Sequence, residues 1–242
     1  MSAGNKTISS TTVKLGIYEQ SNDAQLASML GQVKELDDGR KFRLCFANGS
    51  LTAGILVQSP ATEAYDDELV VNTAASVGDK EIEITVTSGH GGYDENYLSG
   101  GFLMVTKGTN CIGNFYKIKG NDAMVAGATA TVFLYDALVV AIAASDEVGI
   151  AKNPYKDVVT GSTTAPVIGV PLIAVTDNYY FWAQFEGMGP GIDSGATIAA
   201  GDELSHVGGD VIIQDGSEDK DVGMSINAAA ANEGVIVNYK GI

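Results

Sequence analysis

Only two histidines occur among the 242 residues, so any histidine-based catalysis depends on two places in the chain. His90 lies in the run Ser-Gly-His-Gly-Gly-Tyr-Asp at 88–94. A His-Gly-Gly run is typical of the oxyanion loop of esterases, but that chemistry also needs a Gly-x-Ser-x-Gly elbow, which the sequence lacks. We therefore expect His90 to lie in an exposed glycine-rich loop without a catalytic role.

The second histidine, His206, directly follows Ser205, which resembles a nucleophile beside its base. Neighbouring residues of a strand point to opposite faces of the sheet, so these two side chains do not form such a pair. The sequence also contains no phosphate-binding loop, no dinucleotide-binding fingerprint and no His-Glu-x-x-His motif. We expect no catalytic, cofactor-binding or metal-binding residues and no enzymatic activity.

Aromatic residues gather at 179–182, a run that includes the one tryptophan, Trp182. We expect this run to form the core of the C-terminal domain and one exposed edge. A sugar-stacking platform and a contact between subunits are the alternatives. Carboxylates are plentiful, so a glycosidase pair stays open, although such a pair would need an aromatic-lined site.

Two cysteines and two acidic runs are the remaining candidates for chemistry. Cys45 and Cys111 lie among apolar residues and outside any Cys-x-x-Cys pair. We expect buried free thiols, with a disulfide as the alternative. The acidic runs at 66–68 and 215–221 lack the ligand spacing of an EF-hand loop. We expect solvated turns there, and opportunistic calcium binding stays open.

Composition and charge exclude several classes of partner. The net charge is −16, from 30 acidic and 14 basic residues, and the basic residues are scattered. Affinity for nucleic acid comes mainly from Lys and Arg at the phosphates, so we expect binding neither to nucleic acid nor to anionic lipid. The longest apolar run, 137–144, is too short to cross a bilayer, and the N-terminus does not resemble a signal peptide. These features predict a protein made in the cytoplasm.

Hydrophobic periodicity predicts a β protein. Residues 81–86 alternate apolar and polar side chains, which places Ile82 and Ile84 on the core face of a strand. Asn48-Gly49 favours a tight hairpin between strands at 41–47 and 51–58. Short helical pieces are expected at 23–30 and 136–144. The other expected strands are 68–71, 102–106, 114–119, 129–134, 167–175, 179–186, 203–207, 210–214, 222–226 and 235–239.

We expect an all-β fold of two small domains, each a β-sandwich or a barrel, with an N-terminal arm and little helix. Residues 1–33 are polar and form the arm, which is either a strap over the chain's own body or an extension toward another subunit. A turn-rich stretch at 153–166 separates a domain at 34–155 from a C-terminal domain at 156–242. A weak echo between 51–56 and 198–204 is too short to establish a repeat.

Several short motifs follow one another in a fixed order at 38–43, 51–58, 99–105, 113–120, 132–138, 152–155, 169–172, 180–184 and 200–202. This order resembles the decoration, or cement, proteins of tailed-bacteriophage heads. The resemblance extends from about residue 36 to the end of the chain. It implies a structural protein without catalytic residues or cofactors, bound as a homotrimer to the major capsid protein on the outer surface of the virion.

Two other functions compete with this interpretation. The first is another virion part, such as a head fibre or a tail or baseplate protein, although the sequence shows neither long repeats nor coiled-coil heptads. The second is a carbohydrate-binding module or a glycan-degrading enzyme, which predicts a groove around Trp182.

Overall fold

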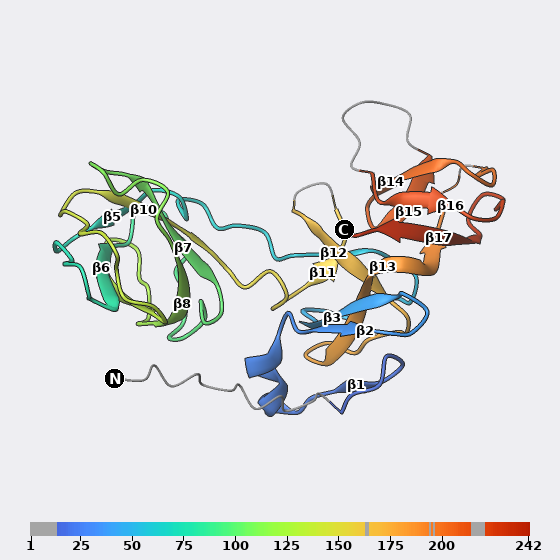
Figure 1. The fold of residues 1–242 in the computed structure, drawn as a ribbon, viewed down its shortest axis with the longest axis horizontal. Coiled ribbons are helices and arrows are strands. Elements are labelled where there is room, and N and C mark those ends of the chain that lie inside the picture. The colour runs from blue at the N-terminus through green and yellow to red at the C-terminus, as the bar shows by residue number, and fades with distance from the viewer. Residues whose placement is uncertain (1–13, 163–164, 194, 196, 214–220) are drawn as a thin grey trace.

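A computed structural model describes residues 14–162, 165–193, 195, 197–213 and 221–242 of the protein. The described chain is nearly all β, with one 3-10 helix at Ala24–Met29. The expected all-β class with little helix is confirmed. Figure 1 shows two lobes, a barrel and a larger sheet, that are connected by extended chain.

The barrel is closed and antiparallel, in the strand order β10-β5-β6-β9-β8-β7. Its interior holds alternate residues of each strand, including Ile82, Ile84, Leu103 and Ile118. Closure pairs every strand on both sides, so the barrel has no open sheet edge. The strands are β5 (Leu69–Val71), β6 (Glu81–Thr85), β7 (Phe102–Lys107), β8 (Phe115–Asn121), β9 (Thr129–Leu134) and β10 (Glu147–Ala151).

The larger sheet is built on one long strand, β13 (Tyr180–Ile192), which pairs with strands from both ends of the described chain. Its main path is β11-β4-β12-β13-β17-β16-β14-β15, and β1 and β3 also pair with β13. The other strands are β1 (Gln20–Ser21), β2 (Val33–Glu35), β3 (Lys41–Phe46), β4 (Val57–Gln58), β11 (Val159–Thr160), β12 (Val167–Pro171), β14 (Glu203–Val207), β15 (Asp210–Ile213), β16 (Gly223–Ser225) and β17 (Gly234–Lys240).

The strand pairing groups the chain differently from the expected division into 1–33, 34–155 and 156–242. β3 pairs with β13, and β4 pairs with β11 and β12, so both strands belong to the sheet of the C-terminal region. The barrel is therefore an insertion between β4 and β11. Residues 14–33 are a strap over this sheet, because Leu15 and Leu26 pack in one apolar cluster with Trp182. Residues 1–13 of the expected arm lie outside the described residues.

Two local predictions are wrong. β3 and β4 do not form a hairpin, because β3 is held between β2 and β13. Residues 136–144 form bends and turns instead of a helix, and Ile142 makes a bridge to Ala75 there. The helical piece near 23–30 is confirmed as a 3-10 helix, and the Asp23 side chain accepts a hydrogen bond from the Gln25 amide at its start.

One turn recurs through both lobes. It begins at a buried residue that makes an isolated antiparallel bridge, has a positive φ three residues later and then enters a strand or turn. Each copy is bridged to another copy, and the echo between 51–56 and 198–204 joins two of them. The bridged pairs are Leu51 with Val175, Ala75 with Ile142, Tyr93 with Met124, and Ile198 with Ala229. The positive-φ residues are Gly54, Asn178, Gly78, Ser145, Asn96, Gly127, Gly201 and Asn232.

Candidate functional site

Trp182 lies in the core of the large sheet. Its side chain is 2% exposed, and its indole Nε1 donates a hydrogen bond to the Leu15 carbonyl at 2.9 Å. The Lys34 ammonium lies 4.8 Å from the ring centroid. The expectation of a core role is confirmed. No ring face is available to a sugar, so a stacking platform at Trp182 is ruled out.

The two cysteines are buried free thiols, as expected. Burial raises the pKa of the Cys45 thiol far above its ordinary value. Burial also raises the pKa of Cys111, with a further contribution from its hydrogen bond to Asp146. Neither thiol is therefore activated as a nucleophile.

Ser205 and His206 occupy adjacent positions of β14. Their cross-strand partners on β15 are Ile212 and Val211, and both side chains are buried. Since successive strand residues point to opposite faces, the two side chains lie on opposite sides of the sheet. They do not form a nucleophile–base pair.

The expectation for His90 is wrong, because the side chain is buried instead of exposed. Only 4% of the residue is accessible, and its Nε2 lies 3.1 Å from Asp66 Oδ1. The Gly92 amide donates to His90 Nδ1 at 2.8 Å, so Nδ1 carries no proton and Nε2 is the donor to Asp66. The contact joins residues 24 positions apart in the chain, so a local sequence motif does not reveal it.

Asp66 is the centre of this buried polar cluster. Tyr93 donates its hydroxyl to the carboxylate at 2.9 Å, and the Glu63 amide donates to Oδ2 at 2.8 Å. The expected charged turn at 66–68 is thus only partly correct, since Asp66 is buried while Asp67 and Glu68 are exposed. The other acidic run falls mostly on 214–220, outside the described residues.

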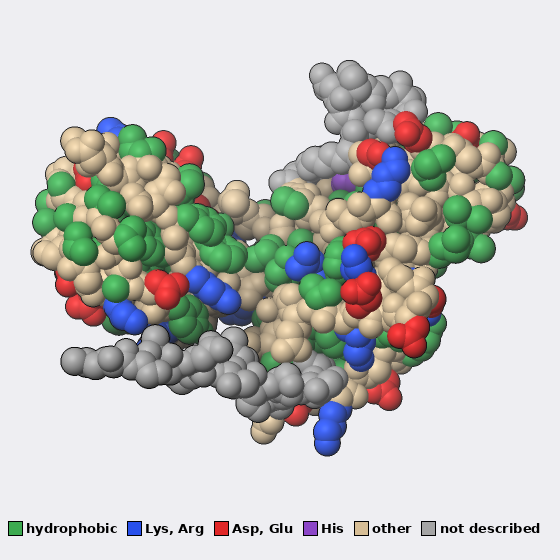
Figure 2. All heavy atoms as spheres, in the orientation of Figure 1, with side chains coloured by type: hydrophobic (Ala, Val, Ile, Leu, Met, Phe, Trp, Pro, Cys, Tyr) green, Lys and Arg blue, Asp and Glu red, His purple; other side chains and the backbone are tan. Residues whose placement is uncertain are grey.

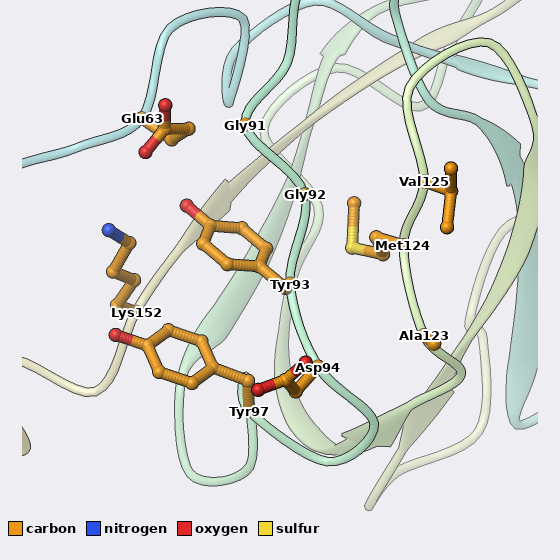
Figure 3. Close-up of a pocket in the computed structure, with 10 residues that line it drawn as sticks. All are labelled: Glu63, Gly91, Gly92, Tyr93, Asp94, Tyr97, Ala123, Met124, Val125 and Lys152. Carbon is orange, nitrogen blue, oxygen red and sulfur yellow. The ribbon is translucent and has the colours of Figure 1, made fainter.

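The cluster adjoins an open pocket of about 430 Å³ at the mouth of the barrel. Figure 3 shows Tyr93 and Tyr97 one above the other at the pocket, with the end of Lys152 beside their hydroxyl ends. The rings stack at a centroid distance of 5.1 Å and 11°. Lys156 covers Tyr97 at 4.1 Å from its centroid.

These contacts leave the cluster unsuited to acid–base catalysis or sugar stacking. The two nitrogens of His90 are engaged by Gly92 and Asp66, and the Asp66 carboxylate accepts three separate donors. The face of Tyr97 is shared between a second tyrosine and a lysine. The arrangement therefore holds loops together instead of presenting a reactive group. The described residues contain no group of three or more His, Cys, Asp or Glu side chains placed to hold a metal ion.

Two apolar faces at the protein surface are better candidates for function. On the barrel, Phe102 and Phe115 stack at 5.0 Å, Phe115 is 60% exposed, and Met104 is the cross-strand partner of Phe115. We call these three residues the barrel face. β7 and β8, which carry them, lie on the side of the barrel nearer the large sheet (Figure 1).

The second apolar face consists of Met188, Pro190, Met224 and Ile236 on β13, β16 and β17, and is called the sheet face. Strand register places its members on one side of the sheet, and Met188 is 58% exposed. An apolar groove runs over Met188, Pro190 and Ile236. Figure 2 shows hydrophobic side chains at the surface over the ends of these strands.

The charges that border the sheet face are paired within the chain. Lys41 Nζ lies 2.9 Å from Glu186 Oε1, and Lys240 Nζ lies 2.8 Å from Asp221 Oδ2. The chain as a whole carries a net charge of −16. The sheet face therefore offers an apolar contact with little local repulsion in an otherwise acidic protein.

The chain matches no protein-family model, and it shows no significant similarity to a curated protein or to a solved structure. Within the described ranges, no helix is both long enough and apolar enough to cross a membrane.

Proposed function

We propose that the protein is a structural component of a tailed-bacteriophage particle, a decoration protein that binds the outside of the icosahedral head. The observation that carries the proposal is the pair of exposed apolar faces on an acidic all-β chain. Such faces mark protein–protein contact sites when they extend beyond scattered single residues. The partners are the major capsid protein and further copies of this chain, arranged as a homotrimer.

The physical demands on such a protein fit the features of the molecule. The genome presses the shell outward, and a protein that spans the seams between capsomers resists this pressure through many modest contacts. A closed barrel supports this role, since it presents a rigid surface without an open sheet edge. The net charge of −16 favours a position outside the shell, away from the nucleic acid.

The test is to locate and count the protein in purified particles. Quantitative mass spectrometry of virions is expected to find hundreds of copies per particle, and cryo-electron microscopy is expected to find them outside the shell. A handful of copies per particle would support a tail, baseplate or fibre protein instead. Complete absence from the particle would refute both.

A matched pair of variants tests the sheet face. Ile236→Asp places a charge on this face, whereas Val139→Asp places one at an exposed apolar residue of the barrel, outside this face. We expect Ile236→Asp to weaken binding to shells that lack the protein, and Val139→Asp to bind as the unmodified chain does. Light scattering of the purified chain tests the trimer, and a stable monomer at high concentration would count against it.

A further inference from the structure

The barrel is joined to the large sheet by two connecting segments, residues 59–68 and 152–158. Among the described strands, no strand of the barrel pairs with a strand of the large sheet. The second segment belongs firmly to the sheet side, since the Tyr155 carbonyl accepts from the Phe46 amide and the Val158 amide donates to the Phe46 carbonyl, both at 2.9 Å. The orientation of the barrel therefore depends on what ties it to these segments.

One barrel tyrosine ties down the first segment. Tyr93 donates its hydroxyl to Asp66, which lies at the barrel end of that segment, where its carbonyl accepts from the Ile150 amide of β10. The Asp66 carboxylate in turn accepts from the Glu63 amide and so holds the preceding part of the segment. His90 holds the same carboxylate from the barrel side. All three side chains are buried, so these bonds are shielded from competing water.

A second barrel tyrosine ties down the second segment. Tyr97 donates its hydroxyl to Asp157 Oδ2 at 2.8 Å. Lys156 donates to the Tyr97 carbonyl at 3.0 Å and places its ammonium 4.1 Å from the centroid of the Tyr97 ring. The second segment therefore contacts the hydroxyl, the ring and the backbone carbonyl of Tyr97.

The two ties are physically joined. The rings of Tyr93 and Tyr97 stack on each other, so displacement of one disturbs the other. Lys152, at the start of the second segment, lies 5.1 Å from the Tyr93 centroid and donates to the Ala61 carbonyl of the first segment at 2.9 Å. Figure 3 shows Tyr93, Tyr97 and Lys152 meeting at one place on the barrel.

We propose that the Tyr93–Tyr97 pair is a conformational clasp that sets the orientation of the barrel relative to the large sheet. When the clasp is closed, both connecting segments are held against the barrel. When it is open, the barrel turns on the two connecting segments, and the barrel face takes a new position relative to the sheet face. The clasp is inferred from contacts within the chain and does not depend on the proposed function.

The test uses pulsed electron–electron double resonance on the full chain to measure the distance between two spin labels, one on each lobe. Spin labels are placed at Val77→Cys on the barrel and Val33→Cys on the large sheet, since both residues are exposed and the native cysteines are buried. We expect one narrow distance distribution with the clasp intact. Tyr97→Ala is expected to broaden it, because the stack with Tyr93 and both side-chain contacts to the second segment, the hydroxyl to Asp157 and the ring under Lys156, are lost, while only the bond from Lys156 to the backbone carbonyl remains.

Two further variants separate the clasp from a general loss of structure. Tyr135→Ala removes an exposed barrel tyrosine away from the segments and is expected to keep the narrow distribution. Asp157→Asn keeps an oxygen that accepts from Tyr97 and is expected to keep it as well. Amide exchange in β8 and β9 confirms that the barrel of Tyr97→Ala stays folded. A narrow, unshifted distribution in a folded Tyr97→Ala variant would overturn the proposal, as would equal broadening in Tyr135→Ala.

Discussion

Replacing Asp66 by alanine is expected to destabilise the barrel far more than the same change at the next residue. Asp66→Ala removes the acceptor of His90 Nε2, the Tyr93 hydroxyl and the Glu63 amide. His90 and Tyr93 are buried, so water does not replace the lost acceptor without rearrangement. Each buried donor left without a partner costs about 1–3 kcal/mol. With two such donors, we expect a loss of about 2–6 kcal/mol in the free energy of unfolding.

Asp67→Ala is the matched control, because Asp67 is the adjacent residue, carries the same charge and is exposed. Its removal is expected to change stability by less than about 0.5 kcal/mol. The assay is urea unfolding followed by amide exchange in the barrel strands, because a two-lobed chain need not unfold in one step. Equal stability of the two variants would refute the conclusion that Asp66 organises this cluster.

Three other predictions concern titration, the recurring turn and the core. Burial raises the pKa of Tyr239 and of Tyr97 above the ordinary value, so these phenols stay neutral in the folded chain at a pH where the phenols of the unfolded chain ionise. The free energy of unfolding, measured in urea, is therefore expected to fall as the pH rises above about 10. The fall is expected to be smaller in Tyr97→Phe. Gly201→Ala meets no atom within 4 Å but keeps φ at +92°, so backbone strain alone is expected to cost about 1 kcal/mol in thermal unfolding; an unchanged melting temperature would contradict this. Trp182→Ala is expected to cost about 3–5 kcal/mol in the free energy of unfolding, measured by urea unfolding. Cys45 packs with Phe181 on the opposite face of the sheet from Trp182, so it is expected to react with a thiol reagent only after denaturation, in the unmodified chain and in the variant alike.

The alternation of apolar and polar residues was sufficient to predict which side chains of a strand are buried, where that alternation is regular. The run at 81–86 predicted Ile82 and Ile84 on the core face, and both are fully buried in β6. The apolar surroundings of Cys45 and Cys111 likewise predicted buried thiols. A period of two residues is a property of neighbouring side chains, so it survives without knowledge of the partner strand.

The recurring turn lies at the boundary of what a sequence reveals. Its members share a buried residue and, three residues later, a glycine, asparagine or serine with positive φ. In some copies an acidic side chain then accepts from the turn, as Asp79 does from the Ser76 amide and Asp202 from the Ala199 amide, both at 2.7 Å. Because so few positions of the turn are restricted, its copies share only a weak sequence similarity. The turn becomes recognisable from the bridges between its copies in the structure.

Composition and local pattern were sufficient to predict the β class, the amphipathic strands, the buried thiols and the acidic character, because each depends on residue content or on residues close together in the chain. Three features became visible only in the folded chain: β3 pairs with β13, the barrel is inserted between β4 and β11, and His90 contacts Asp66 close to the stacked Tyr93 and Tyr97. These contacts join residues far apart in the chain, and their formation depends on how all strands share one sheet or close one barrel. No local periodicity carries that information.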